Sequence, residues 1–276
     1  MSNLITRLIT GVIGGAVVVG AIFLSYRGLW LFGTVVSLVC LWEFMHGARL
    51  SHPKYLWSVM TFGILIWGLA WVLPGEQDVV LIGAMMVILP SLEVLTLLFQ
   101  KEDQFPHNLG LMVLGFFYCL IPLLLFYKMA VPDDVVAYDP RLPMGILVLV
   151  WSLDSTAFFV GRAFGKTLLY PRVSPKKTWE GAIGGAIGCL IAGAVLMYTW
   201  PIYRISGFSW IIVAAIVSVF SQLGDLVESS LKRSMDLKDS GNILPGHGGM
   251  LDRFDGFMLS LPFIYLYFIY LYYILP

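Results

Sequence analysis

Charged residues are scarce in this chain: Asp, Glu, Lys and Arg make up 12% of its 276 residues, whereas 59% are hydrophobic. A soluble domain of this length needs more polar residues to cover its surface, so the composition excludes an ordinary cytosolic protein and favours a bilayer as solvent. The 17 basic residues balance the 17 acidic ones, so no excess positive charge indicates a nucleic-acid partner. Any charge that serves a function must therefore be concentrated in particular segments of the chain.

Cysteine is also rare. Cys40, Cys119 and Cys189 are odd in number, far apart and each inside an apolar run. This pattern argues against a disulfide framework or a thiolate metal site, and we interpret all three as small buried hydrophobic residues. The apolar stretch after Arg7 has no clear small-x-small cleavage site, so it is predicted to be the first membrane helix.

Long apolar runs dominate the rest of the chain. A helix needs about 20 residues to cross a hydrocarbon core of roughly 30 Å. Nine segments meet this requirement, near residues 7–24, 29–46, 55–73, 79–99, 109–130, 143–162, 181–200, 208–228 and 256–275. The first two are separated only by the short link Ser25–Gly28. The sequence therefore predicts an all-α, polytopic integral membrane protein with about nine transmembrane helices.

Basic residues favour a cytoplasmic N-terminus. With that orientation, thirteen of the 17 Lys and Arg residues fall in cytoplasmic segments, and only Arg27, Lys128, Arg141 and Arg204 fall outside. Two cytoplasmic segments, 163–180 and 229–255, carry eight of these thirteen basic residues and are predicted to hold the chemistry.

The predicted external loop 131–142 contains two prolines and three aspartates. We interpret it as the seam between N-terminal transmembrane helices, residues 1–135, and a catalytic transmembrane region, residues 136–276. The first region is expected to support packing or dimer formation.

The segment from Ser229 to Asp255 is neither a linker nor a span. Pro245 and three glycines surround His247 and allow close backbone approach, as phosphate-binding loops require. Asp252 and Asp255 are three residues apart at the start of the last helix and project from one face of its first turn, and Asp225 is predicted to end the preceding helix.

Carboxylates that converge from two helix ends suit a hard divalent cation, most naturally Mg²⁺ held together with nucleotide phosphates. Nearby basic residues would neutralise the remaining phosphate charge; they are Lys232, Arg233, Lys238 and Arg253. The alternative is a solvated juxtamembrane loop whose basic residues contact anionic lipid head groups.

This segment resembles the signature of the phosphatidate cytidylyltransferases, also called CDP-diacylglycerol synthases. The pattern is S-x-L-K-R-x4-K-D-x-G-x2-L-P-x-H-G-G-M-x-D-R-F-D, and residues 229–255 depart from it at no fixed position. Residues 154–166 (DSTAFFVGRAFGK) and 174–181 (SPKKTWEG) are similar to other segments of that family. The resemblance is clear over roughly 150–260.

The resemblance implies a homodimeric enzyme of the cell (inner, cytoplasmic) membrane. It would condense CTP with phosphatidate to CDP-diacylglycerol and pyrophosphate at the cytoplasmic face. Asp225 and Asp252 would hold the metal, and a second, monovalent cation such as K⁺ is implied as well. The predicted catalytic set consists of Asp225, Asp252, Asp255, Lys238, Asp239 and His247.

Further residues are assigned to substrate or phosphate binding. Asp154, inside the sixth span, is too costly to leave unpaired in lipid and is expected to face a polar cavity or a cation, with Ser155 beside it. In residues 174–180, the proline is predicted to direct the chain into a new helix and to leave Lys176 and Lys177 at its positive end. Either lysine, taken singly, fits phosphate binding and a positive-inside anchor of the seventh span equally well. The remaining predicted members are Lys232, Arg233, Arg253, Gly248 and Gly249.

Other polar residues in the spans are less specific. Ser218, Ser221 and Gln222 share one helix face with Asp225, which is predicted to line the active-site cavity. Glu43 and Glu93 fit a site and a packing role equally well. Glycines 181, 184, 185 and 188 at helical spacing indicate close helix packing.

Three other functions compete with the nucleotidyltransferase. A cation-coupled transporter would use Asp154, Asp225 and Glu93 as an ion path, but the charge is concentrated in two loops on one side. A CDP-alcohol phosphotransferase would need a D-G-x2-A-R-x8-G-x3-D-x3-D pattern, which the sequence lacks. A non-catalytic scaffold gives no reason for the dense segment 232–255.

Overall fold

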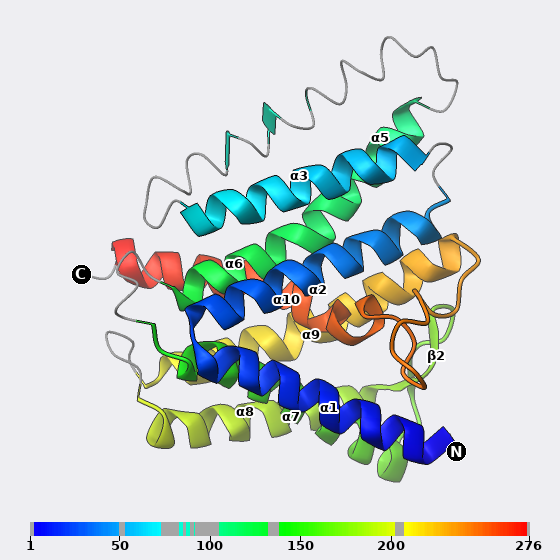
Figure 1. The fold of residues 1–276 in the computed structure, drawn as a ribbon. Coiled ribbons are helices and arrows are strands. Elements are labelled where there is room, and N and C mark those ends of the chain that lie inside the picture. Colours follow the sequence, from blue (N-terminus) through cyan, green and yellow to red (C-terminus); the bar gives the residue numbers. More distant parts are fainter. Residues whose placement is uncertain are drawn as a thin grey trace. The chain divides into compact units, whose positions relative to one another are not determined.

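The described part of the chain is almost entirely α-helical (Figure 1). This computed structural model describes residues 3–49, 53–72, 105–131, 138–201 and 207–274, with five isolated residues between 83 and 91. Its helices are α1 (Asn3–Leu24), α2 (Tyr26–Gly47), α3 (Pro53–Val72), α5 (Phe105–Gly115), the π-helical turn η1 (Phe116–Leu120), α6 (Ile121–Ala130), α7 (Arg141–Phe164), α8 (Trp179–Thr199), α9 (Ser209–Ser234) and α10 (Leu251–Ile274). Two short strands, β1 (Leu168–Tyr170) and β2 (Ser174–Thr178), form a hairpin.

Eight helical segments among the described residues are long and apolar enough to cross a bilayer, and α5, η1 and α6 together form one of them. Large side chains such as Leu8, Phe159 and Ile191 remain at least 60% exposed, as lipid-facing residues do. The predicted all-α polytopic membrane fold is confirmed. The predicted span 79–99 lies almost entirely outside the described residues, as do Glu93, Lys101 and Arg204, so the count of nine and the cytoplasmic N-terminus stay predictions.

Contacts divide the chain into two compact units. Unit 1 contains residues 1–138 and 239–251, and unit 2 contains residues 139–238 and 252–276. The boundary after residue 138 falls close to the predicted seam after residue 135. The segment 239–251, which the sequence assigned to the catalytic region, packs with the first unit instead.

The core of unit 1 is built around Trp67 of α3, which is fully buried. Its indole N–H donates to Ser37 Oγ of α2 at 2.8 Å, and the Trp30 indole of α2 donates to the Trp67 carbonyl at 2.9 Å. A side chain at Gly33 would collide with the Trp67 ring, so α2 approaches α3 at a glycine. These contacts hold α2, which carries Glu43.

A single residue, Ser25, separates α1 from α2. Its hydroxyl oxygen accepts a 3.2 Å hydrogen bond from the Gly28 amide and so caps the N-terminus of α2. A Cβ at Gly28 would overlap the Ala21 carbonyl, so the tight reversal needs glycine there. The first two predicted spans are therefore separate helices, although their link is so short.

In unit 2, α7 and α8 lie side by side (Figure 1). A Cβ at Gly185 of α8 would lie 2.9 Å from the Ala157 methyl group and 3.1 Å from the Leu153 carbonyl oxygen of α7. Gly184 and Gly188 meet side chains of α7 at similarly close range. The glycine face of α8 serves helix packing, as the sequence predicted.

Helix α9 packs against both α7 and α10. Gly145 of α7 leaves room for the Trp210 ring of α9, and the rings of Phe220 and Phe263 stack with centroids 3.5 Å apart. Near the other end of this pair, the Tyr267 hydroxyl of α10 donates to Ser209 Oγ at 3.0 Å.

The end of α9 differs from the prediction. The helix continues to Ser234, beyond the expected end at residue 228, so Asp225 lies more than two turns before the C-terminus rather than at it. The additional turn carries Lys232 and Arg233, whose positive charges complement the helix dipole, and Lys232 pairs with Glu228 one turn earlier.

The start of α8 also differs from the prediction. Pro175 does not begin a helix: residues Ser174–Thr178 form β2, which pairs antiparallel with β1. The helix begins at Trp179, where the Thr178 hydroxyl accepts a 3.2 Å hydrogen bond from the Gly181 amide. The Glu180 carboxylate accepts from the Lys166 and Thr167 amides and ties the hairpin to the helix. Lys176 and Lys177 therefore lie on a strand.

We expect Gly185→Leu to destabilise the protein by about 1–3 kcal/mol, because the new side chain would force α7 and α8 apart. Thermal unfolding in detergent measures this change. The matched control is Gly15→Leu on α1, where a Cβ meets nothing within 4 Å. Equal stability of the two variants would contradict the packing role of Gly185.

Candidate active site

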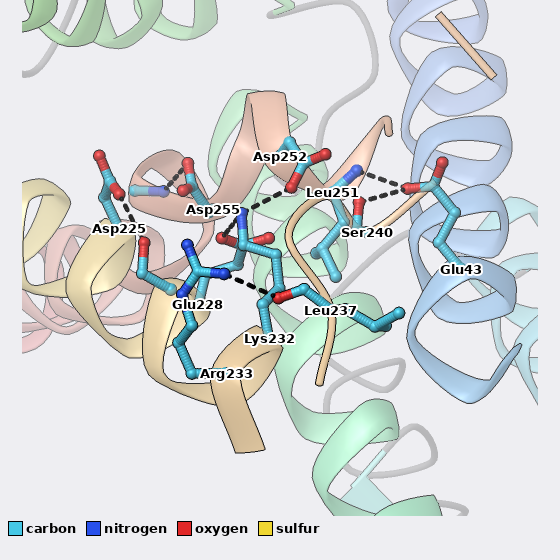
Figure 2. Close-up of polar contacts among 12 residues, drawn as sticks. Glu43, Asp225, Glu228, Lys232, Arg233, Leu237, Ser240, Leu251, Asp252 and Asp255 are labelled. Atoms are coloured by element: carbon cyan, nitrogen blue, oxygen red, sulfur yellow. Dashed lines mark hydrogen bonds and ion pairs between the residues drawn. The ribbon is translucent and has the colours of Figure 1, made fainter. Parts of the chain in front are cut away.

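Charged side chains of unit 2 gather where α9 and α10 meet (Figure 2). Gly224 of α9 faces the Asp255 carbonyl and Gly256, and Gly256 of α10 faces the backbone of Ser221. Because both glycines lack side chains, the two backbones approach closely. The neighbouring acids Asp225 and Asp255 are thereby brought near enough for their charges to act on each other.

One ion pair joins β2 to α9. The Lys177 ammonium contacts the Asp225 carboxylate, which also accepts a 3.4 Å hydrogen bond from the Ser229 hydroxyl. Asp154, in the middle of α7, interacts electrostatically with both charges of the pair. The side chains of Lys177 and Asp225 keep 30% and 39% of their surface exposed, so an incoming anion or cation can replace either partner.

A second set of ion pairs centres on Lys232 near the end of α9. Its Nζ lies 2.5 Å from the Glu228 carboxylate and 2.7 Å from Asp252 Oδ1 (Figure 2). Glu228 is 1% exposed and Asp252 is 7% exposed. Since an uncompensated buried carboxylate costs several kcal/mol, Lys232 serves as the counter-ion that the two acids share.

Asp255 completes the cluster from the first turn of α10. One carboxylate oxygen accepts a 2.7 Å hydrogen bond from the Gly256 amide. The charge of Asp255 also interacts with those of Lys177, Lys232 and Glu228. The structure therefore unites six predicted site residues in unit 2, which are Asp154, Lys177, Asp225, Lys232, Asp252 and Asp255.

Glu228 was missing from the predicted site set. A signal for it existed in the sequence, because it lies three residues after Asp225 and four before Lys232, which places all three on neighbouring positions of one helix face. The predicted end of α9 at residue 228 hid this relationship.

Three predicted basic residues lie away from the ion pairs. Lys176 is exposed and lies in β2 next to Lys177. The two side chains point to opposite faces of the strand, because side chains alternate along it. Arg233 donates to the Leu237 carbonyl at 3.2 Å, just beyond the end of α9. Lys238 is exposed beyond that helix. No described contact joins these three to the acidic cluster.

Two further predicted residues of unit 2 lie at its surface. Arg253 is exposed in the first turn of α10. Ser155 lines a groove of about 560 Å³ between α7 and α8 together with Trp151, Thr156 and Ile191. The groove is mostly apolar, so it suits a hydrocarbon chain better than a phosphate.

The remaining predicted residues, Asp239, His247, Gly248 and Gly249, belong to unit 1. Gly248 has a φ of +87°, so the predicted unusual dihedrals occur in this loop. The His247 amide donates to the Leu244 carbonyl at 2.9 Å and closes a tight turn. Asp239 is exposed at the start of the loop, whereas Gly249 is buried.

The same loop rests on the first half of α1. The Thr10 hydroxyl donates to the Pro245 carbonyl at 3.1 Å. Gly11 lies beneath the His247 ring, and Gly246, with a φ of +75°, lies against Arg7. The loop is therefore supported by α1 as well as by α2.

The predicted polar face of α9 does not line a cavity beyond Asp225. Ser218 and Ser221 are buried, and the Ser218 hydroxyl donates to the Ala214 carbonyl at 2.7 Å within the helix. Gln222 donates to the Ala182 carbonyl of α8 at 3.2 Å. These polar groups form hydrogen bonds within and between the packed helices, because a polar atom that water cannot reach needs a partner nearby.

The acids of the cluster fit a magnesium ion only in part. Among the described residues, no three or more His, Cys, Asp or Glu side chains are arranged to hold a metal ion by themselves. The carboxylates of Asp225 and Asp255 are nevertheless near enough for their charges to interact, and Lys177 contacts Asp225. This donor chemistry suits Mg²⁺, which commonly uses one or two carboxylates and takes its other ligands from substrate phosphates and water.

The fold and the cluster define a class: a polytopic membrane protein with paired acids and lysines suited to binding a phosphate compound. Residues 5–271 match the Cytidylyltransferase family. The chain therefore belongs to that family.

Several curated relatives carry the name phosphatidate cytidylyltransferase. The protein from Brucella abortus is 33% identical over 271 residues, covering 97% of this chain and 94% of the relative. The Haemophilus influenzae protein is 34% identical over 282 residues, covering 93% and 96%. The Bacillus subtilis protein is 52% identical over 120 residues, 43% of this chain and 44% of that protein.

We expect Lys232→Met to destabilise the protein by about 3–5 kcal/mol, because Glu228 and Asp252 would lose their shared counter-ion. Denaturant-induced unfolding measures the loss. The double variant Lys232→Met with Glu228→Gln should recover part of it, since one buried charge is removed as well. Arg233→Met, which changes an exposed cation of the same helix turn, is the control. A loss no larger than that of the control would contradict the counter-ion role.

Proposed function

We propose that this protein transfers the CMP group of CTP to phosphatidate, making CDP-diacylglycerol and pyrophosphate. Membership of the cytidylyltransferase family supports this activity, as do the names of its full-length relatives. The observation that carries the proposal is the cluster around Lys177–Asp225 and Lys232–Asp252, which is formed by β2, the C-terminal part of α9 and the first turn of α10. Such a position suits one substrate anchored in lipid and one dissolved in water.

In the proposed reaction, a phosphate oxygen of phosphatidate forms a bond to the α-phosphorus of CTP. The bond between that phosphorus and the oxygen bridging to the β-phosphorus breaks, and pyrophosphate leaves with the electron pair. The attacking oxygen is already anionic near neutral pH, so the protein needs no strong general base. Positioning and charge neutralisation supply most of the rate acceleration, as in phosphoryl transfer generally.

The lysines of the cluster are suited to this task. Each is already held in place by carboxylates, so little side-chain freedom is lost when a phosphate binds. Lys177 is the more accessible of the two and is proposed to contact substrate phosphate, whereas Lys232 keeps Asp252 oriented. Asp154 is proposed to hold Lys177 from the α7 side.

Asp225 and Asp252, the acids to which the family resemblance assigns the metal, are proposed to hold Mg²⁺, and Asp255 interacts with the charge of Asp225. When bound, the ion would neutralise charge on the nucleotide phosphates and on the departing pyrophosphate. A monovalent cation such as K⁺ and a homodimeric assembly are further proposals, and the family resemblance alone supports them.

We also propose that the site faces the cytoplasm in the cell (inner) membrane. The distribution of basic residues supports this orientation, because thirteen of 17 fall in predicted cytoplasmic segments. CTP is a cytoplasmic metabolite, so this side also provides the soluble substrate. Cysteine labelling at Lys238 and at Arg27 from either side of the membrane tests the orientation.

We expect purified protein to form lipid-linked CMP from phosphatidate, labelled CTP and Mg²⁺, and Asp252→Asn to abolish this product while membrane insertion is retained. The matched control is Asp236→Asn, an exposed acid of the same segment whose φ of +56° asparagine also tolerates. Pyrophosphate released without a nucleotide-bearing lipid would show that the lipid substrate is wrong. Ion flux without CTP consumption would favour the transporter instead.

We expect Lys177→Ala to lower kcat/KM for CTP by about 100-fold, as removal of one charge-stabilising donor often does. Lys176→Ala should cause a smaller loss, because its side chain lies on the opposite face of β2. Steady-state kinetics on both variants measures the difference. Equal losses would mean that the strand orientation does not select the phosphate-binding lysine.

A further inference from the structure

Glu43 is a buried acid of α2, one turn before the end of that helix. Its side chain is 1% exposed. The carboxylate accepts hydrogen bonds from the Ser240 hydroxyl at 3.1 Å and the Leu251 amide at 2.9 Å (Figure 2). It also accepts one from the Met250 amide at 3.0 Å. One intramembrane carboxylate thus binds three donors from a segment roughly 200 residues away in the chain.

These donors come from both ends of the loop 239–251. Ser240 lies at its beginning, and Met250 and Leu251 lie at its end, so Glu43 closes the loop upon itself. Two glycines leave space for the carboxylate: a Cβ at Gly241 would overlap Glu43 Oε1, and one at Gly249 would lie 2.6 Å from Oε2. The loop and the acid are therefore fitted to each other within unit 1.

The contact also determines how α10 begins. Its helical segment starts at Leu251, and the first amides of a helix have no carbonyl acceptor in their own helix. Glu43 accepts from the first of these amides, at Leu251, and from the Met250 amide just before the helix, and it places negative charge at the positive end of the helix dipole. A distant helix thus provides the cap that a neighbouring Ser, Thr or Asp usually provides.

We propose that Glu43 is a positioning residue for the nucleotidyl-transfer site. Leu251 is followed directly by Asp252, and Asp255 lies one turn further along α10. By binding the Met250 and Leu251 amides, Glu43 holds the backbone that leads directly into both acids. The catalytic consequence rests on the proposed function, whereas the structural contact with Met250 and Leu251 does not.

Hydrogen exchange tests the contact directly. In Glu43→Gln the side chain keeps one acceptor oxygen, and its new NH₂ group faces amide donors. Exchange at Met250 and Leu251 should therefore become about 10- to 100-fold faster, with protection elsewhere in α2 retained. The control is Ser37→Ala, which removes the Trp67 hydrogen bond from the same helix and should leave exchange at 250–251 unchanged.

A second variant perturbs the contact without altering Glu43. In Gly241→Ala the new methyl group displaces the carboxylate, so exchange at 250–251 should again become faster. Gly68→Ala on α3, where a Cβ meets nothing within 4 Å, is the matched control. This pair keeps the test decisive if Glu43→Gln does not fold.

Activity measurements separate positioning from simple stabilisation. We expect kcat per folded molecule to fall by on the order of 100-fold in Glu43→Gln, as a displacement of about 1 Å at a reacting centre can cause. The Mg²⁺ concentration for half-maximal activity should rise, while melting temperatures of Ser37→Ala and Glu43→Gln remain comparable. Glu43→Asp, which keeps the charge, should recover part of the kcat.

The outcomes are distinct. Unchanged exchange at 250–251 in both Glu43→Gln and Gly241→Ala would overturn the proposal. Faster exchange with unchanged kcat and Mg²⁺ dependence would also overturn it, because the contact would then be structural only. If the wild-type protein forms no lipid-linked CMP, the proposed function fails, and the exchange experiment still decides whether Glu43 holds the start of α10.

Discussion

A carboxylate that leaves water must find a cation or several hydrogen-bond donors, and both units of this protein depend on that constraint. In unit 2, Lys232 lies between Glu228 and Asp252, while Lys177 accompanies Asp225. In unit 1, Glu43 is matched by a hydroxyl and two amides of the loop 239–251. Each acid is thereby confined to one position, which a site for phosphate chemistry needs, because charge neutralisation works only over short distances.

Glycines make these arrangements possible. The contact between Gly224 and Gly256 lets α9 and α10 approach until their acids interact, and Gly241 and Gly249 leave space for the Glu43 carboxylate. Within a bilayer, helices gain little from burying apolar side chains against each other, so close backbone approach and polar contacts acquire more weight. The small residues therefore bring the charged ones together, and the apolar faces of the same helices meet lipid.

Much of the fold was predictable because length and hydropathy determine a membrane span almost locally. The exact ends of the helices were less predictable. The sequence predicts the end of α9 at residue 228 because residues 229–233 are polar and charged, whereas the Glu228–Lys232 pair extends the helix. It predicts a helix start at the lysines of β2, because the pairing of β2 with β1 cannot be recognised in such short strands. It predicts Ser218 and Ser221 at a cavity, whereas both are buried in helix contacts.

The sequence by itself determined that this is an integral membrane protein and which of its segments can cross the bilayer. It also identified the acids and lysines of the family signature at 229–255. Only the tertiary structure decided which of these groups interact. It pairs Asp225 with Lys177 rather than Lys176, adds Glu228 as a further buried acid, and places Glu43 at the start of α10. The reason is physical. Hydropathy acts on each segment separately, whereas a buried charge is stabilised by whichever groups the folded chain brings within a few ångströms, often from helices far apart in sequence.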